Sequence, residues 1–456
     1  MTHADRAVVI GSGMGGLLAA RALSETYAEV VVVDRDLIPE GSAARKGVPQ
    51  GRQLHVLLAR GREAFDTLFP GMSTELARLG SPLVDLQHQV HWYNDGHRMR
   101  RAPSPLLAFG ISRPLLEHTV RARVAALPGV RLVSGCEVLG LTATPDSRRV
   151  TGVRVLPRGE TAESVIDADM VVDAGGRASR SPIWLEELGY ARAPEERVQV
   201  DLTYVTRVYK REPHHLDGLL GALTNAVPGL PRGGIVAVQE DDRLGVALSG
   251  VLGEEPPTDD EGMVRYAETL AAPQIAEIVR SAVPVSAPAK MRFPASVRRR
   301  YERLRRFPGG YLVTADALCG FNPVYGQGMT VAALEALLLR RLIASGTDDL
   351  ARRFFRGAAR LIDAPWSISV GTDLRFPEVE GRRSMTVRLV NAYVGMLHAA
   401  AVTDPALGAA FIRVLNLIDP PARLMAPATV FRVLRGTLGR RSPLPMPAWR
   451  RPRPRG

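Results

Sequence analysis

Residues 11–16 read Gly-Ser-Gly-Met-Gly-Gly and separate an apolar run from a helix-like stretch, a spacing suited to binding phosphate. Gly11 allows a tight turn, Gly13 lets the backbone approach a pyrophosphate, and Gly16 permits close packing of helix on strand. Met14 opens the helix, whose first amides point at the phosphates. The turn therefore predicts a bound adenine dinucleotide.

An acidic residue supports this prediction. Asp34 ends the next apolar run, residues 30–33, and follows the glycine turn by roughly 20 residues. At that spacing a carboxylate hydrogen-bonds the ribose hydroxyls of a dinucleotide. We assign Asp34 and its neighbour Arg35 to the same site.

A second segment with matching chemistry lies about 300 residues later. An apolar run at residues 311–314 predicts a buried strand, Asp316 follows it, and a glycine-containing loop at residues 322–329 precedes an apolar helix at residues 330–343. Glycines before a helix leave free amides at its positive end, which suits a carbonyl or a partial anion. An aspartate at a strand end can hold a chain of hydroxyls.

The two segments together resemble the FAD-contacting motifs of the para-hydroxybenzoate hydroxylase superfamily, the group A FAD-dependent monooxygenases. By that resemblance Asp316 binds the ribityl chain of FAD. The same loop contributes Pro323, and Gly326, Gly328 and Met329 face the pyrimidine edge of the flavin.

Further segments resemble a bacterial branch of the superfamily that includes the polyether epoxidases, with squalene epoxidases as more distant relatives. These segments are residues 45–50 with 55–58, 112–117 and 321–326. The resemblance implies that Arg45 and Arg113 contact the FAD phosphates or ring region, and that Val138 contacts adenine through its backbone.

Two positions depart from the family pattern. Ala315 stands where the second motif has glycine, a change that costs little provided that the backbone φ is negative. Gly175 replaces the acid of the middle motif that assists flavin and NADPH binding, and Asp173 lies two positions earlier. The reducing equivalents therefore come either from NAD(P)H directly or from a separate flavin reductase.

The elements that must position these residues predict an α/β (α+β) fold, in which a Rossmann-like FAD-binding domain is interleaved with a β-sheet substrate domain. We expect the FAD domain at residues 1–80, 105–185 and 295–345, and the substrate domain at 81–104 and 190–295. Residues 346–440 form a helical C-terminal region, and residues 441–456 a Pro- and Arg-rich disordered tail.

Composition bounds the compartment and the partners. Two cysteines in 456 residues, no room for a signal peptide and no apolar run long enough to span a bilayer predict a cytoplasmic protein without a metal site. Nine arginines after residue 420 account for most of the net charge of +12. No nucleic-acid module accompanies them. The basic residues 428–438 permit at most peripheral contact with a membrane, and packing on the protein itself is the alternative.

The resemblance implies a monooxygenase of bacterial secondary metabolism. A flavin C4a-hydroperoxide would insert one oxygen atom from O2 into a lipophilic polyene, polyketide or terpenoid, with epoxidation as the expected reaction. The flavin carries this chemistry, so no catalytic residue is assigned. His91, Tyr93, Tyr204 and Tyr325 are the candidates for the substrate pocket.

Other activities of the same fold stay open. An aromatic-ring hydroxylase would use a base to remove a phenolic proton. A flavin-dependent prenyl reductase or redox-neutral cyclase would not consume oxygen. The Trp-x-Trp-x-Ile-Pro segment of flavin halogenases is absent from the sequence. From a different class, a flavoprotein that serves as a binding subunit would be yellow but redox-inert.

Overall fold

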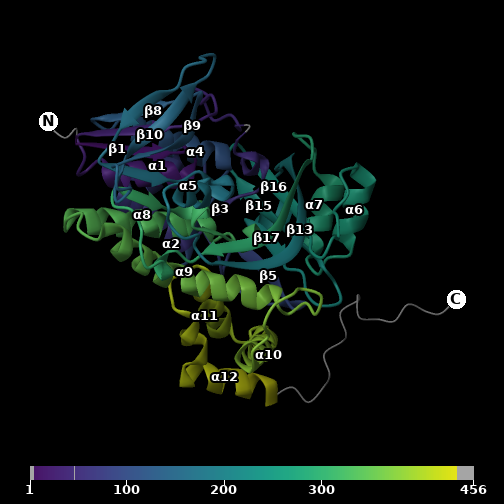
Figure 1. Ribbon diagram of the computed structural model, residues 1–456. Helices are drawn as coiled ribbons and strands as arrows, with labels where there is room; N and C mark the ends of the chain where they lie inside the picture. Colours follow the sequence, from purple (N-terminus) through teal and green to yellow (C-terminus); the bar gives the residue numbers. More distant parts are fainter. Residues whose placement is uncertain (1–4, 46, 439–456) are drawn as a thin grey trace.

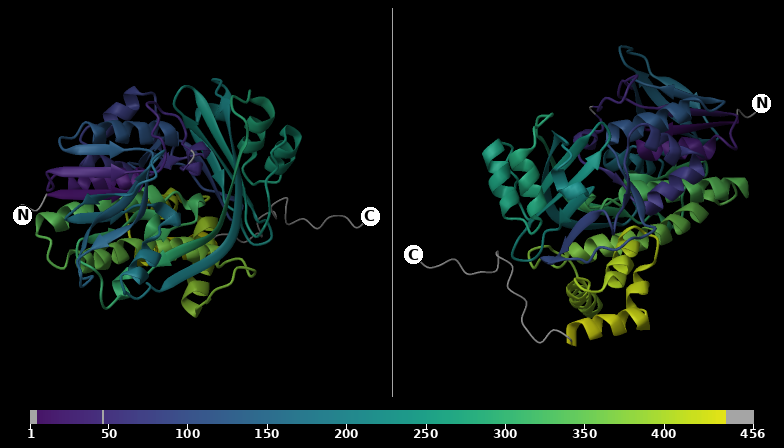
Figure 2. Two further views of the ribbon diagram at one scale, coloured as in Figure 1. Left: turned by 45° about the horizontal axis from the view of Figure 1, so that its top comes forward. Right: turned by 180° about the vertical axis from the view of Figure 1, so that it is seen from behind.

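The computed structural model describes residues 5–45 and 47–438 of the chain. Two lobes, each built on a large sheet, lie side by side, and the C-terminal helices lie against them (Figures 1 and 2). The tail expected to be disordered, residues 441–456, lies outside the described residues.

The first lobe contains a five-stranded parallel sheet with the strand order β18-β12-β1-β2-β8. Its central strands are short runs of valine, isoleucine and alanine that are buried on both faces, as parallel sheets require. The strands are β1 (Arg6–Ile10), β2 (Glu29–Val33), β8 (Val130–Val133), β12 (Met170–Asp173) and β18 (Tyr311–Val313).

Helices cover this sheet and carry the two glycine-rich segments at their starts. α1 packs on α8, and α8 packs in turn on α2 and α9. The helices of this lobe are α1 (Met14–Leu23), α2 (Ala59–Leu68), α3 (Met72–Arg78), α4 (Arg113–Ala125), α5 (Ser181–Glu187), α8 (Gly328–Ala344) and α9 (Leu350–Asp373).

Two small antiparallel sheets complete the lobe. One follows β8 in the chain as a meander, and the other lies under α2. The meander is β9 (Cys136–Ala143), β10 (Val150–Pro157) and β11 (Ser164–Asp167), and the second sheet is β3 (Val56–Leu57), β7 (Leu107–Gly110) and β4 (Leu83–Asp85).

The second lobe is an eight-stranded sheet with the order β19-β17-β13-β16-β15-β14-β5-β6, and all its neighbouring strands are antiparallel except β14 and β5. The strands are β5 (Val90–Asn94), β6 (His97–Arg98), β13 (Glu195–Lys210), β14 (Gly221–Thr224), β15 (Arg232–Gln239), β16 (Arg243–Gly250), β17 (Ala289–Arg299) and β19 (Cys319–Gly320).

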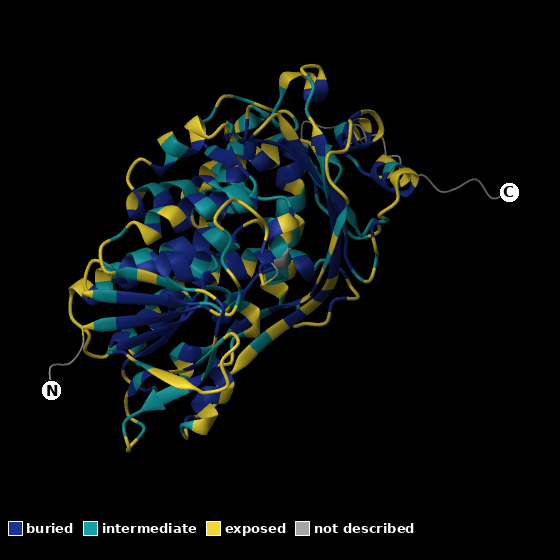
Figure 3. Cartoon of the chain, turned by 90° about the horizontal axis from the view of Figure 1, so that it is seen from above, coloured by how far each residue is buried: buried dark blue, intermediate teal, exposed yellow. Residues whose placement is uncertain are grey.

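Helices α6 (Asp260–Glu268) and α7 (Pro273–Ser281) cover one face of this sheet (Figure 1). Their apolar side chains bury Val205, Val236 and Val246 of the sheet. The opposite face is turned toward the first lobe, and both sheets are largely dark blue, that is buried, in Figure 3. The fold class predicted from the sequence is confirmed, whereas the exact domain boundaries stay a prediction.

The C-terminal helices form a third group. α10 (Met385–Ala400), α11 (Pro405–Leu415) and α12 (Pro427–Leu438) pack on one another and, through a separate apolar cluster, on the strands around β5. No helix in the described part of the chain is long and apolar enough to cross a membrane.

Candidate active site

The glycine turn between β1 and α1 is built as its spacing predicts. Gly11 has a φ of +95°, and a Cβ there would lie 2.9 Å from the carbonyl oxygen of Ala174. A Cβ at Gly16 would lie 1.8 Å from the carbonyl oxygen of Gly11, so only glycine lets α1 pack this closely. A Cβ at Gly13 would meet no atom within 4 Å, because Gly13 faces an open cavity.

The start of α1 is free to bind an anion. No side chain caps the helix, and its first turn contains no acidic residue. Unpaired amides at a positive helix end suit a phosphate group. Gly13 and Met14 line the cavity at this point, while Gly16 lies beneath it as a packing residue.

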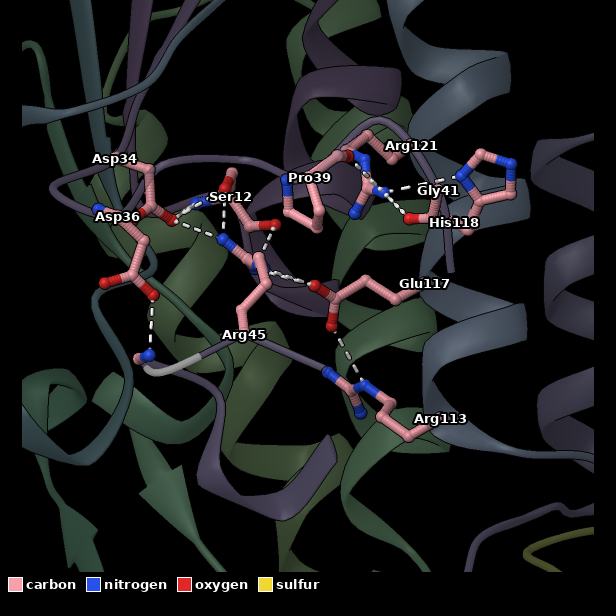
Figure 4. Close-up of polar contacts among 11 residues, drawn as sticks. Ser12, Asp34, Asp36, Pro39, Gly41, Arg45, Arg113, Glu117, His118 and Arg121 are labelled. Atoms are coloured by element: carbon pink, nitrogen blue, oxygen red, sulfur yellow. Dashed lines mark hydrogen bonds and ion pairs between the residues drawn. The ribbon is translucent and has the colours of Figure 1, made fainter. Parts of the chain in front are cut away.

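Asp34 lies beside this turn at the end of β2. Its Oδ2 atom accepts hydrogen bonds from the backbone N–H and the hydroxyl group of Ser12, at 2.7 and 2.6 Å (Figure 4). Burial alone would raise the pKa of Asp34, but hydrogen bonds from Ser12 and from the Asp36 backbone outweigh it and hold the pKa below its ordinary value. Asp34 is thus an ionised acceptor, as a ribose-binding carboxylate must be.

Arg45 connects Asp34 to helix α4. Its Nη1 atom lies 3.2 Å from Asp34 Oδ2, and its Nε donates to Glu117 Oε1 at 2.9 Å (Figure 4). Arg113 Nε donates to the other oxygen of Glu117 at 3.1 Å. The Arg45 side chain is only 2% exposed. Arg45 therefore holds Asp34 in place, whereas the ribose contact of Asp34 and direct contact of Arg45 or Arg113 with FAD stay predictions.

The second motif brings Asp316 to the same cavity. Asp316 follows β18 in a single helical turn, Ala315–Ala317, and none of the hydrogen bonds among the described residues involves its carboxylate. Burial raises its pKa, against the opposing charges of Arg177 and Arg113. A half-buried carboxylate that faces a cavity without a protein donor fits a ligand that supplies hydroxyl groups.

Alanine in place of the motif's glycine would cost little only at a negative φ. The φ of Ala315 is +55°, so this condition is not met. A left-handed conformation costs a residue with a Cβ about 1–2 kcal/mol. Glu335 of α8 holds the strained segment: its Oε2 atom accepts from Ala315 N and from Thr314 Oγ1, both at 2.7 Å. No sequence motif pointed to this role, because Glu335 stands alone among the apolar residues of α8.

The loop before α8 is held by a second buried acid. Asp373 Oδ1 accepts from Tyr325 Oη at 2.9 Å and from Asn322 Nδ2 at 3.1 Å. Burial raises the pKa of Asp373 to about 7. Tyr325 lines the cavity, and Gly326 has a left-handed φ of +68° that glycine accepts readily.

Asp173 organises the degenerate middle motif. Its Oδ1 atom accepts from Gly175 N at 2.7 Å, and its Oδ2 atom accepts from the hydroxyl groups of Ser179, at 2.5 Å, and Ser181. The carboxylate therefore fixes the loop at residues 175–181 from within.

One cavity of about 950 Å³ contains most of the predicted site residues. Those that line it from the cofactor set are Gly11, Gly13, Met14, Asp34, Arg35, Arg45, Arg113, Val138, Asp316, Pro323, Gly326, Gly328 and Met329. The cavity continues to the C-terminal helices, which the sequence did not assign to the site. There it is lined by Val387, Val390, Val394, His398, Phe411 and Leu415.

The substrate-pocket candidates on the large sheet lie on its two opposite faces. Tyr204 lines the cavity, where its hydroxyl donates to Met291 Sδ at 3.1 Å. Tyr93 lies on the far side of β5, where its hydroxyl donates to Gln274 at 3.3 Å, and His91 does not line the cavity either. The correction is one of register: successive strand residues face opposite sides, and Trp92 and Asn94 line the cavity instead.

Comparison with known proteins identifies relatives over most of the chain. Residues 9–68 match the family of NAD(P)-binding Rossmann-like domains. Protein Rv3254 of Mycobacterium tuberculosis is 34% identical over 438 residues, which cover 91% of this chain and 90% of that protein. The chain belongs to the family of Protein Rv3254.

Other similarities relate this family to flavin-dependent enzymes. Kynurenine 3-monooxygenase of Salinispora arenicola is 30% identical over 177 residues, or 38% of this chain and 36% of that enzyme. The solved structure of the flavin-dependent brominase Bmp2 has a TM-score of 0.67 and 15% identity, and covers 96% of this chain and 99% of Bmp2. The chain thus has the fold of flavin-dependent monooxygenases and halogenases. The epoxidase branch stays a prediction.

Proposed function

We propose that this protein is an FAD-dependent monooxygenase that transfers one oxygen atom from O2 to a lipophilic small molecule. The observation that carries the proposal is the single cavity of about 950 Å³. Both flavin-type motifs lie along it, and it continues between mostly apolar side chains of the C-terminal helices.

The residues at the motif end fit FAD. The free amides of α1 would bind the pyrophosphate, Asp34 the adenosine ribose and Asp316 the ribityl hydroxyls. A second uncapped helix end, at Gly328 of α8, would present amides to the flavin carbonyl groups. When bound, FAD supplies the activation of dioxygen.

The protein's own contribution is to orient the substrate and to exclude water. Tyr204, Met291 and Phe293 of the large sheet line the cavity between the two motifs and the C-terminal helices. Apolar walls keep competing water away from the reacting atoms. This division of labour requires no nucleophile or catalytic triad.

We place the substrate among polyenes, polyketides and terpenoids of bacterial secondary metabolism, with epoxidation as the reaction. Two features support this finer proposal: the resemblance of residues 45–50, 112–117 and 321–326 to the polyether epoxidase branch, and the apolar lining from α10 and α11. The electron donor is NAD(P)H or a separate flavin reductase, and the protein acts in the cytoplasm.

The test is product analysis under ¹⁸O2. The FAD-loaded protein is photoreduced, mixed with a panel of lipophilic polyenes and polyketides, and exposed to labelled oxygen. We expect a product that has gained one labelled oxygen atom. A product that is reduced or rearranged and carries no label would instead assign the protein to the reductase or cyclase activities of the same fold.

A further inference from the structure

The C-terminal helices leave large apolar side chains exposed. Met385 and Leu389 of α10 are 68% and 65% exposed, and Phe431 of α12 is 65% exposed. Side chains of this kind are mostly buried in a folded chain, and several that are exposed on neighbouring elements mark an interaction surface. We call the exposed apolar residues of this region the C-terminal patch: Met385, Leu389, Val390, Met396, Met425, Phe431 and Leu434.

Helix α10 has two apolar faces. Met385, Leu389 and Met396 lie four and seven residues apart, so they form one exposed stripe along the helix. A different face carries Leu397 and Ala400, which are buried in the apolar cluster of the C-terminal helices. The second face packs the helix onto the protein, and the first has no packing role among the described residues.

Helix α12 is built in the same way. Val433 is buried in the same cluster, and a Cβ at Gly436 would lie 2.8 Å from the Cβ of Ala400, so α12 packs closely on α10. Phe431 and Leu434 lie outside this contact and are exposed. Figures 1 and 2 show α12 at the outer edge of the molecule, with α10 beside it. Packing on the protein and contact with a membrane, the two alternatives left by the sequence, are therefore compatible.

The patch adjoins the cavity. Val390 of α10 and Met425 of the helical turn η7 (Pro421–Met425) belong to the patch and also line the cavity. Tyr393 Oη donates to the backbone carbonyl of Leu424 at 2.7 Å and holds η7 against α10. The exposed apolar surface therefore continues into the cavity lining at these two elements.

The charges of the same elements have one sign. The segments α10, η7 and α12 contain four arginines and no aspartate or glutamate. Arg432 forms an ion pair with Asp404 at 2.9 Å, whereas Arg388 and Arg435 form none among the described residues. The sequence that follows, residues 439–456, adds six arginines and no acidic residue. The surface is therefore both apolar and positively charged.

We propose that the C-terminal patch docks the protein onto a membrane surface that contains anionic lipids. The exposed apolar side chains enter the boundary between headgroups and acyl chains, and the arginines pair with lipid phosphate groups. A second copy of the same face would bring unpaired arginines together, and a nucleic acid would leave the apolar side chains in water. An anionic membrane is the partner that satisfies both features.

Docking goes beyond the proposed function, because it depends on the patch and on the charge of the lipid and requires no turnover. Where the proposed function holds, docking also gives the substrate a route. A lipophilic molecule dissolved in the membrane passes from the patch to the cavity at Val390 and Met425 without crossing bulk water.

Co-sedimentation of the FAD-loaded, full-length protein with lipid vesicles tests the docking. The vesicles consist of phosphatidylcholine alone or of phosphatidylcholine mixed with phosphatidylglycerol, each at low and at high salt. We expect binding to the mixed vesicles at low salt, and weaker binding to phosphatidylcholine alone. High salt should weaken binding to the mixed vesicles, because it screens the arginines. The oligomeric state without vesicles shows whether a second copy covers the patch.

A triple serine variant tests the apolar part of the contact. Met385→Ser, Leu389→Ser and Phe431→Ser change exposed residues that do not line the cavity, so folding and FAD content should be unchanged. Together they should lower the affinity for mixed vesicles by about tenfold or more. The matched control changes three similarly exposed valines outside the C-terminal helices: Val165→Ser, Val283→Ser and Val285→Ser.

A double variant tests the charged part. Arg388→Gln with Arg435→Gln should lower the affinity for mixed vesicles by about tenfold. The same variant should bind vesicles of phosphatidylcholine alone as the native protein does, because these vesicles carry no net charge. Arg148→Gln, a change of an exposed arginine in the first lobe, is the control.

Binding to mixed vesicles that is lost in the triple serine variant and kept in the triple valine control supports the proposal. It is overturned if the native protein does not bind mixed vesicles, or if the triple serine variant binds them equally well. It is also overturned if the native protein is a dimer that the serine changes convert to a monomer. Incorporation of labelled oxygen tests the proposed function separately, because vesicle binding does not depend on product formation.

Discussion

Asp316 is the carboxylate that we expect FAD binding to depend on most directly, because it faces the cavity without a hydrogen-bond donor among the described residues. Asp316→Asn removes the charge-assisted hydrogen bonds to ribityl hydroxyls and should weaken FAD binding by about tenfold, and Asp316→Ala by more. Quenching of FAD fluorescence measures the affinity. Asp242→Asn changes an exposed residue away from the cavity and should bind FAD normally. Full FAD occupancy in Asp316→Ala would refute the ribityl contact.

A substitution at Gly13 tests phosphate binding separately from folding. A side chain there meets no protein atom within 4 Å, so Gly13→Val should fold with an unchanged melting temperature. The same side chain fills the space for the pyrophosphate, and FAD binding should be lost. Gly41→Val, an exposed change outside the cavity, is the control. A yellow, FAD-loaded Gly13→Val protein would contradict the assignment.

Ala315 carries strain that glycine would relieve. Its φ of +55° costs about 1–2 kcal/mol, more than the roughly 0.5–1 kcal/mol that glycine loses through its greater freedom in the unfolded chain. We expect Ala315→Gly to raise the melting temperature of the FAD-free protein slightly, by no more than about 2 °C. Ala317→Gly, at a buried position without positive φ, should lower it. If the melting temperature fell equally in Ala315→Gly and Ala317→Gly, Ala315 would not be strained.

At the scale of elements, α8 links pH to stability through Glu335. Burial raises the pKa of Glu335 to about 7, from an ordinary value of 4.5. Between these values the folded chain binds a proton that the unfolded chain has released. Stability from this group is therefore complete below about pH 4.5 and is lost as the pH rises through about 7.

Glu335→Gln should flatten this dependence. The amide oxygen can still accept from Ala315 and Thr314, but the side chain no longer titrates. We expect the melting temperature of the FAD-free native protein to fall between pH 5 and pH 8, and to fall less in Glu335→Gln. Glu187→Gln, an exposed change on α5, should behave like the native protein. An identical pH dependence in Glu335→Gln would show that Glu335 does not titrate in this range.

Local spacing explains which elements and site residues the sequence could predict. The β1–α1–β2 unit is encoded within about 30 residues: Gly11, Gly13 and Gly16 have fixed roles, and Asp34 follows at the end of the next strand. The strand–loop–helix around Asp316 is equally compact. Its backbone strain was not predictable, because φ at Ala315 depends on how Glu335 holds the segment.

Long-range contacts explain what the sequence did not predict. Asp95 and His398, which are hydrogen-bonded in the cavity wall, are 303 residues apart, so no motif joins them. The choice of His91 and Tyr93 was an error of register, since β5 reads Val-His-Trp-Tyr-Asn and large side chains alternate on both faces. Only the packing of α7 against one face and of the C-terminal helices against the other decides which residues line the cavity.

At the scale of the whole molecule, the cavity joins three parts of the chain: the parallel-sheet lobe, the large antiparallel sheet and the C-terminal helices. Each part alone leaves the site incomplete. The first supplies the groups that fit FAD, the second supplies one wall, and the third supplies the mostly apolar end. Substrate choice should therefore be changeable without loss of the cofactor.

Val394→Trp tests this separation. Val394 lines the apolar end from α10, and an indole there should reduce product formation by about tenfold or more while FAD affinity is unchanged. Ala392→Trp places the same group on the exposed side of the helix and should retain activity. If Val394→Trp lost FAD affinity as well as activity, the two ends of the cavity would not be independent.

The central claim is that this cavity couples FAD to oxygen transfer, and the stoichiometry of a single turnover tests it most directly. The FAD-loaded protein is photoreduced and mixed with oxygen and a lipophilic substrate, and the oxygen consumed, the hydrogen peroxide released and the product formed are measured together. The account predicts one oxygenated product for each O2 consumed, with little peroxide. Oxygen returned entirely as hydrogen peroxide, or substrate converted without oxygen uptake, would contradict it.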